Sequence, residues 1–161
     1  MAQIKFYELL AQKPDKFAQM EKEIVEEYKI PVEKYSGAGI YSIGIKDKIV
    51  YVGKSKDMLN RVCNHIQHIK DETEGHKYEL LHGIQNRGYT IQFNVLEHCE
   101  VDSLDEKEIY WINEIKPYLN TQFPHFDNEG KVRWKTRSIR YETVDRLEAY
   151  VNNKDLDKFV F

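Results

Sequence analysis

The sequence predicts a mixed α/β (α+β) fold, and three patterns carry this prediction. Two short stretches on either side of a polar turn alternate apolar and polar residues, which is typical of a β-hairpin. A third alternating stretch follows later in the chain. Around these strands, apolar residues recur at three- and four-residue spacing, which indicates amphipathic helices.

Length and composition limit the function classes. The chain has 161 residues, which suits one domain with appendages and a sizeable core, and it is 41% hydrophobic and 32% charged. The formal net charge of −3 argues against general polyanion binding, so a nucleic-acid site would need a local basic surface. There is no recognisable signal peptide and no apolar run near the roughly 18 residues of a membrane helix. We therefore expect a cytoplasmic protein with no membrane partner.

Residues 1–35 predict a helical N-terminal arm. Two short helices are expected to meet near Pro14, and the second carries an apolar stripe beside four glutamates. Such a cluster usually marks a solvated acidic face, which makes this arm a poor DNA contact. Pro31 ends the helix, and a glycine-containing loop over 36–39 leads into the hairpin.

The predicted hairpin is the centre of the chain. A three-residue loop would pair Ile43 with Tyr51 and place Tyr41 and Tyr51 on one face, whereas a two-residue loop would place them on opposite faces. The sequence leaves this register open. Gly39 and Gly53 flank the open end, where the missing Cβ atoms let a ligand or another strand approach the backbone.

The next predicted helix spans about 56–70, with Ser55 as its N-cap. Arg61 and His65 lie one turn apart, so they share one face of this helix. A short helix over 78–87 and the third strand over 89–96 follow.

A further helix over 103–115 opens on a capping-box pattern, Ser103 with Glu106. Its inward stripe is apolar except at Glu108. A bare carboxylate on that face costs several kcal/mol unless it is paired, hydrogen-bonded or bound to a metal. Glu108 is therefore a candidate functional residue.

Residues 123–161 predict a C-terminal extension of two parts. The run 131–140 holds five basic residues and no acidic one, and a strand there would present a basic face. A DNA-backbone contact is favoured over a solvated edge strand, in which lysines discourage edge pairing. The residues expected to make this contact are Arg133, Lys135 and Arg137. Trp134 would pack beneath them or stack on a base, and 141–161 predicts a last helix.

Five motifs in a fixed order carry a family resemblance: Gly39-Ile40-Tyr41, Tyr51-Val52-Gly53-Lys54, Arg61 with His65, Glu108, and Lys116-Pro117-Tyr118-Leu119-Asn120. Together they resemble the GIY-YIG nuclease domain over about residues 38–121, and we place that domain at 36–122. The Tyr-Val-Gly triplet is a mild departure from the family motif. The resemblance implies a small three-stranded antiparallel sheet flanked by helices, which agrees with the predicted elements.

The resemblance also implies roles for individual residues. Tyr41 would activate the attacking water, Tyr51 would line the scissile phosphate, Arg61 would steady phosphate charge, and Glu108 would ligate Mg²⁺ or Mn²⁺. Lys54, His65 and Asn120 match accessory positions, with Lys54 and Asn120 expected to contact substrate.

The sequence does not decide whether Tyr41 or His65 is the general base. A phenol with a pKa of about 10 is a poor base at neutral pH, but Arg61, Lys54 and a metal would each favour the phenolate of Tyr41. His65 could instead take the proton of the water, or relay it from Tyr41.

The leading hypothesis is a divalent-metal-dependent DNA endonuclease that hydrolyses phosphodiester bonds and leaves 5′-phosphate and 3′-hydroxyl ends. The roughly 40 residues after Asn120 leave little room for a separate recognition domain, which favours a compact restriction-type enzyme or a stand-alone phage or mobile-element nuclease. A homodimer would let such an enzyme cut both strands. The alternative is a catalytically inactive DNA-binding or protein-interaction module on the same fold.

Overall fold

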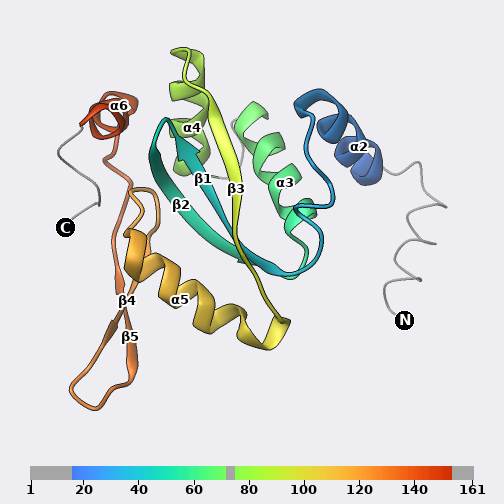
Figure 1. The fold of residues 1–161 in the computed structure, drawn as a ribbon. Coiled ribbons are helices and arrows are strands. Elements are labelled where there is room, and N and C mark those ends of the chain that lie inside the picture. The colour runs from blue at the N-terminus through green and yellow to red at the C-terminus, as the bar shows by residue number, and fades with distance from the viewer. Residues whose placement is uncertain (1–15, 72–74, 154–161) are drawn as a thin grey trace.

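The computed structural model describes residues 16–71 and 75–153, and a three-stranded antiparallel sheet in the order β2-β1-β3 lies at its centre (Figure 1). Helices α3 and α4 cover one face of this sheet, and α5 covers the other. This arrangement confirms the predicted fold class and the sheet that the family resemblance implies. The strands are β1 (Gly39–Ile45), β2 (Lys48–Ser55) and β3 (Ile91–His98), and the helices around them are α3 (Met58–Asp71), α4 (His76–Asn86) and α5 (Leu104–Ile115).

The hairpin register places both tyrosines on one face, by a route that the sequence did not predict. Only two residues form the turn, because Ile45 pairs with Lys48. A β-bulge at Val50 then shifts the pairing by one residue, so a two-residue turn gives the register expected of a three-residue loop. Tyr41 and Tyr51 therefore lie side by side, with ring centroids 6.4 Å apart.

The segment after α5 lies along the free edge of β2. Lys116 ends the helix in the left-handed conformation, at φ 51°, and the following proline prevents its continuation. The chain then runs beside β2, where the Leu119 amide donates to the Val50 carbonyl at 2.8 Å. This edge is where the candidate active site forms.

The predicted N-terminal caps are wrong for two helices. Asp57, rather than Ser55, caps α3 by accepting from the Asn60 amide at 3.2 Å. The Ser55 hydroxyl instead accepts from the Asp57 amide, which precedes the helix. Ser103 does not cap α5, because residues 101–103 already form a 3₁₀ turn and its backbone is helical rather than extended.

The C-terminal extension contains a hairpin of β4 (Gln122–Phe126) and β5 (Val132–Thr136), followed by α6 (Val144–Asn152). The sequence patterns do not predict β4. The last helix begins at Val144 rather than at residue 141, because the Thr143 side chain caps it by accepting from the Arg146 amide. Helix α6 packs on α4 and contributes Leu147 to the main core. The residues of the predicted helix beyond 153 lie outside the described part.

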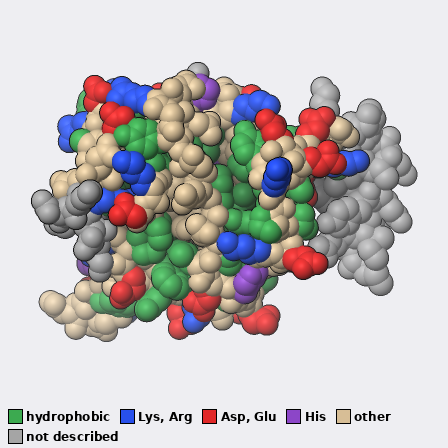
Figure 2. Space-filling model, turned by 45° about the horizontal axis from the view of Figure 1, so that its top comes forward, with side chains coloured by type: hydrophobic (Ala, Val, Ile, Leu, Met, Phe, Trp, Pro, Cys, Tyr) green, Lys and Arg blue, Asp and Glu red, His purple; other side chains and the backbone are tan. Residues whose placement is uncertain are grey.

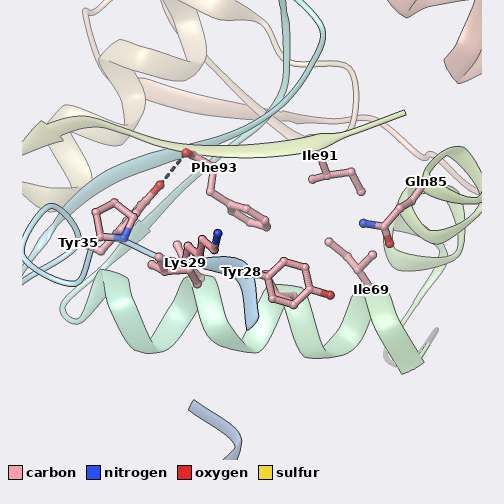
Figure 3. A pocket seen from close by; sticks show the side chains of 11 residues that line it. Tyr28, Lys29, Tyr35, Ile69, Gln85, Ile91 and Phe93 are labelled. Atoms are coloured by element: carbon pink, nitrogen blue, oxygen red, sulfur yellow. Dashed lines mark hydrogen bonds between the residues drawn. The ribbon is translucent and has the colours of Figure 1, made fainter. Parts of the chain in front are cut away.

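On the opposite side, α2 (Lys16–Tyr28) packs against α3, and the first predicted arm helix lies outside the described residues. A cavity of about 190 Å³ separates the end of α2 from α3 and β3 (Figure 3). Tyr35 closes one end by donating to the Phe93 carbonyl at 2.6 Å. Within 16–71 and 75–153, no helix has the length and apolar character needed to cross a membrane.

Candidate active site

A buried chain of three polar rings lies between the sheet and helices α3 and α4. The Tyr41 hydroxyl is 2.6 Å from His65 Nε2, and the Tyr78 hydroxyl is 2.7 Å from His65 Nδ1. His65 comes from α3, Tyr41 from β1 and Tyr78 from α4. All three side chains are at most 4% exposed. Both ring nitrogens of the histidine are therefore engaged by phenols in a water-excluded setting.

Gly53 makes room for this chain. A Cβ atom built at Gly53 would lie 2.5 Å from the Tyr41 hydroxyl and 2.6 Å from the ring carbon that bears it. No side chain fits at that distance, so glycine lets the phenol lie directly over β2. This gives the last residue of the Tyr51-Val52-Gly53 motif a physical reason.

Burial and positive charge together set the ionisation of the cluster. Burial raises the pKa of Tyr41 well above its ordinary value, and the nearby Tyr51 adds to this, while the guanidinium of Arg61 acts in the opposite direction. For His65, burial is again the largest cause, and Lys77 and Arg61 add to it, lowering its pKa to about 2. His65 is thus neutral in the neutral pH range.

Lys77 is a second cation at this site. Its ammonium lies 4.1 Å from the ring centroid of Tyr51 and 4.8 Å from that of Tyr78. Burial lowers its pKa to about 8, with a further contribution from Arg61. Lys77 and Arg61 therefore place two positive charges beside Tyr51, where they would attract an anion.

Glu108 lies on the wall of a pocket of about 450 Å³ at the edge of β2. Its side chain is 18% exposed, and the Lys54 ammonium lies 3.6 Å away while also pairing with Asp105. Burial raises the pKa of Glu108, and Lys54 opposes that shift. The pocket is lined by Tyr51, Val52, Glu108, Ile112, Asn120, Thr121, Gln122 and Trp134.

These surroundings fit a divalent ion held by one carboxylate. Among the described residues, no three His, Cys, Asp or Glu side chains gather to form a metal cage. Mg²⁺ does not require one, since it commonly keeps several waters and binds one or two carboxylates together with phosphate oxygens. The pocket beside Glu108 has space for those waters, and a cation there would offset the burial of the carboxylate.

Asn120 is committed to the backbone of β2. Its side-chain oxygen accepts from the Val52 amide and its nitrogen donates to the Val52 carbonyl, both at 2.9 Å. The amide thus satisfies the edge strand much as another strand would. This geometry supports a role in positioning Tyr51 and Val52, and the contact of Asn120 with substrate stays a prediction.

The basic run of the C-terminal extension is divided between two environments. Arg133 and Lys135 are exposed on β5, and Arg133 pairs with Asp127 at 3.0 Å. The expectation that Arg137 shares this exposed face is wrong, because β5 ends at residue 136 and the alternation ends with it. Arg137 is only 9% exposed and donates to the Tyr118 carbonyl and to Glu142.

No broad basic patch is visible on the face shown in Figure 2, where cationic and anionic side chains are intermingled among the described residues. This agrees with the net charge of −3. Attraction for a polyanion would therefore come from local groups such as those at Arg61, Lys77 and β5.

The sequence had not indicated Lys77 or Tyr78 as site residues. Tyr78 lies three residues before Leu81, which places it on the inward face of α4 and predicts a buried phenol in need of a partner. Nothing in the spacing shows that this partner is His65. Lys77 carries no periodic signal at all, because its position depends on how α4 packs beside Tyr51.

Comparison with known proteins agrees with this geometry. The family model of the GIY-YIG catalytic domain matches residues 37–122, just over half of the chain. The chain therefore belongs to the GIY-YIG family, whose members are nucleases, as the sequence motifs predicted. Searches of curated proteins and of solved structures found no match.

Proposed function

We propose that this chain is a divalent-metal-dependent DNA endonuclease that hydrolyses phosphodiester bonds. The observation that carries the proposal is the buried hydrogen bond between Tyr41 and neutral His65, beside the guanidinium of Arg61. Burying two polar rings next to a cation is costly for stability, and a simple core would use apolar side chains instead. The arrangement suits a phenol that must lose a proton.

In this proposal, the reactive form of Tyr41 is the phenolate, which has released its own proton to bulk water and then accepts the proton of the attacking water. Arg61 and His65 stabilise the negative charge on its oxygen. Arg61 and Lys77 neutralise charge on the phosphate oxygens, with Tyr51 lining the same site. His65 is a poor final proton acceptor in the free protein, since its pKa is about 2. The proposed base is therefore Tyr41, with His65 as its partner.

Glu108 would hold Mg²⁺ or Mn²⁺ in the pocket at the edge of β2. When bound, the ion would supply positive charge to the phosphate and the leaving oxygen. Lys54 is shared between Glu108 and Asp105, so its ammonium can move toward Asp105 when a metal binds. Asn120 would keep the backbone of β2 fixed beside this site.

Substrate contact outside the phosphate site is proposed for β5 and for Lys54. Arg133 and Lys135 are exposed there, and Trp134 lines the same pocket as Glu108 with 45% of its surface exposed. An aromatic side chain beside a phosphate site can stack on a base. The biological role we propose is that of a compact restriction-type enzyme or a stand-alone phage or mobile-element nuclease, with a homodimer for cutting both strands.

The test uses supercoiled plasmid with Mg²⁺ or Mn²⁺, and compares the wild type with Glu108→Ala. The wild type should nick the plasmid, and Glu108→Ala should lose on the order of 10³-fold in rate, because the metal supplies several kcal/mol. DNA binding should remain measurable. Glu106→Ala, an exposed glutamate of the same helix, is the matched control and should retain activity.

Two outcomes would contradict the proposal. Undiminished nicking by Glu108→Ala would remove Glu108 from the metal site. A folded wild type that binds DNA but cuts none with either metal would identify an inactive binding module. Sequencing the ends of the cut DNA tests the finer assignment, since a short recurrent cut sequence supports a restriction-type enzyme and scattered ends oppose it.

A further inference from the structure

We propose that Tyr78 is a positioning residue for this reaction, which donates to His65 Nδ1 and so keeps the imidazole proton on Nε2, facing Tyr41. The inference rests on the proposed function and assigns a role to a residue of α4 that the sequence motifs do not include. Its basis is the number of hydrogens that the buried side chains of Tyr41, His65 and Tyr78 can share.

A neutral imidazole has one N–H and one bare nitrogen. His65 contacts a phenol at each nitrogen, at 2.6 Å and 2.7 Å, so one phenol must donate to the ring while the other accepts from it. The three side chains are at most 4% exposed and each ring nitrogen already faces a phenol oxygen, so the two phenols fill both roles. The nitrogen that faces Tyr41 is always Nε2. If the Tyr78 hydroxyl donates to Nδ1, then Nε2 carries the proton, and if Tyr78 accepts from Nδ1, then Nε2 is bare.

The charges around the cluster favour Tyr41 as the accepting phenol. The positive charge of Arg61 acts on the Tyr41 hydroxyl and lowers its pKa against the effect of burial. An N–H from His65 Nε2, which lies 2.6 Å from the same oxygen, would add to this stabilisation of negative charge. The Tyr41 hydroxyl then accepts from His65, and its own proton points away from the imidazole ring.

The groups that face His65 keep it in the neutral form in which this tautomer matters. They are Tyr41, Tyr51 and Phe93 from the sheet, Arg61 and His68 from α3, and Lys77 and Tyr78 from α4. Burial comes first among the causes, and the cations Lys77 and Arg61 add to it, so that His65 does not take up a second proton in the neutral range. The position of its single proton is then the one variable, and Tyr78 controls it.

The direct test is the ¹⁵N NMR spectrum of the imidazole rings, with His65 assigned through a His65→Gln variant. We expect His65 in the wild type to carry its proton on Nε2. In Tyr78→Phe, which keeps the ring and removes only the hydroxyl, Tyr41 should become the donor and the proton should move toward Nδ1. Tyr35→Phe, which removes another buried phenol hydroxyl, is the matched control and should leave the tautomer unchanged.

Activity gives the second readout. Tyr78→Phe should lower the rate of plasmid nicking by roughly 10- to 100-fold, as for outer partners that orient functional histidines. The pH at which activity rises should also move upward, because Tyr41 loses a donor that favours its phenolate. A purely structural role would lower the thermal stability of Tyr78→Phe as it does that of Tyr35→Phe, without moving the pH profile.

The inference is overturned if wild-type His65 carries its proton on Nδ1, a measurement that requires no variant to fold. It is also overturned if folded Tyr78→Phe keeps both the wild-type tautomer and the wild-type pH profile. The NMR result does not depend on cleavage. A wild type that cuts no DNA would therefore defeat the proposed function while the tautomer can still be measured.

Discussion

The two halves of the candidate site differ in how completely the free protein assembles them. The half that contains Tyr41, His65 and Tyr78 is buried, and each functional atom already has a hydrogen-bond partner. The half that contains Glu108 and Lys54 is more open: Glu108 lies on the wall of a pocket, and the two side chains are 18% and 39% exposed. The difference teaches that the groups proposed for proton transfer are preorganised. The groups proposed to hold the metal are accessible from the pocket.

The two halves also differ in the cation that offsets the burial of their ionisable group. Burial raises the pKa of both Tyr41 and Glu108. For Tyr41 the opposing cation, Arg61, is built into the cluster. For Glu108 it is Lys54, which is shared with Asp105 and can be displaced. In the proposed site, a divalent ion would therefore bind at Glu108 without disturbing the buried cluster.

Tyr41→Phe tests the buried half, where it has the largest expected effect. It keeps the ring packed over Gly53 and removes only the hydroxyl, so the variant should fold normally. Plasmid nicking should fall by at least about 100-fold, the low end for the loss of an acid–base group. Tyr110→Phe, at an exposed position of α5, is the control. Near-wild-type turnover by Tyr41→Phe would move the base role to Tyr51 or His65.

Asn120→Ala tests whether the side-chain amide of Asn120 holds the backbone of β2 in place beside the open half. The substitution leaves the amide and the carbonyl of Val52 without partners in a buried setting. We expect the free energy of unfolding to fall by about 1–3 kcal/mol, the cost of a buried polar group left unsatisfied. Urea denaturation measures this value, with Asn113→Ala as the exposed control on α5. Unchanged stability would return Asn120 to the predicted role of substrate contact.

Much of the fold could be predicted, because local periodicity determined it. The alternation through Tyr41 and Tyr51, and the apolar stripes of α3 and α5, correspond to elements of the structure. The hairpin register could not be predicted, because it depends on a bulge at Val50 and no residue of the turn indicates that bulge. Strand β4 could not be predicted because its own sequence carries a proline, a residue that argues against a strand.

The site divides in the same way. Motif spacing could identify Glu108 and Arg61 because each has a position on a helix face that the sequence specifies. The partner of His65 could not be identified, because Tyr78 reaches it only through the packing of α4 on α3. Arg137 was misplaced for a related reason: the alternation of β5 predicted its face, but the strand ends one residue before it.

The smallest expected effect concerns how an acidic protein holds DNA beside the open half of the site. Arg133 and Lys135 are exposed on β5, and Arg133 would exchange its ion pair with Asp127 for one with a phosphate. Each phosphate contact contributes roughly 0.9 to the slope of log affinity against log salt. The double substitution Arg133→Ala and Lys135→Ala should flatten that slope by up to about two units, and weaken binding to all sequences alike. Affinity is measured without divalent metal, so that no cleavage occurs, and Lys22→Ala with Lys34→Ala is the matched loss of two exposed lysines away from the site. If slope and affinity are unchanged in a folded variant, β5 is a solvated edge, and the backbone contacts belong to the cations between Lys54 and Lys70.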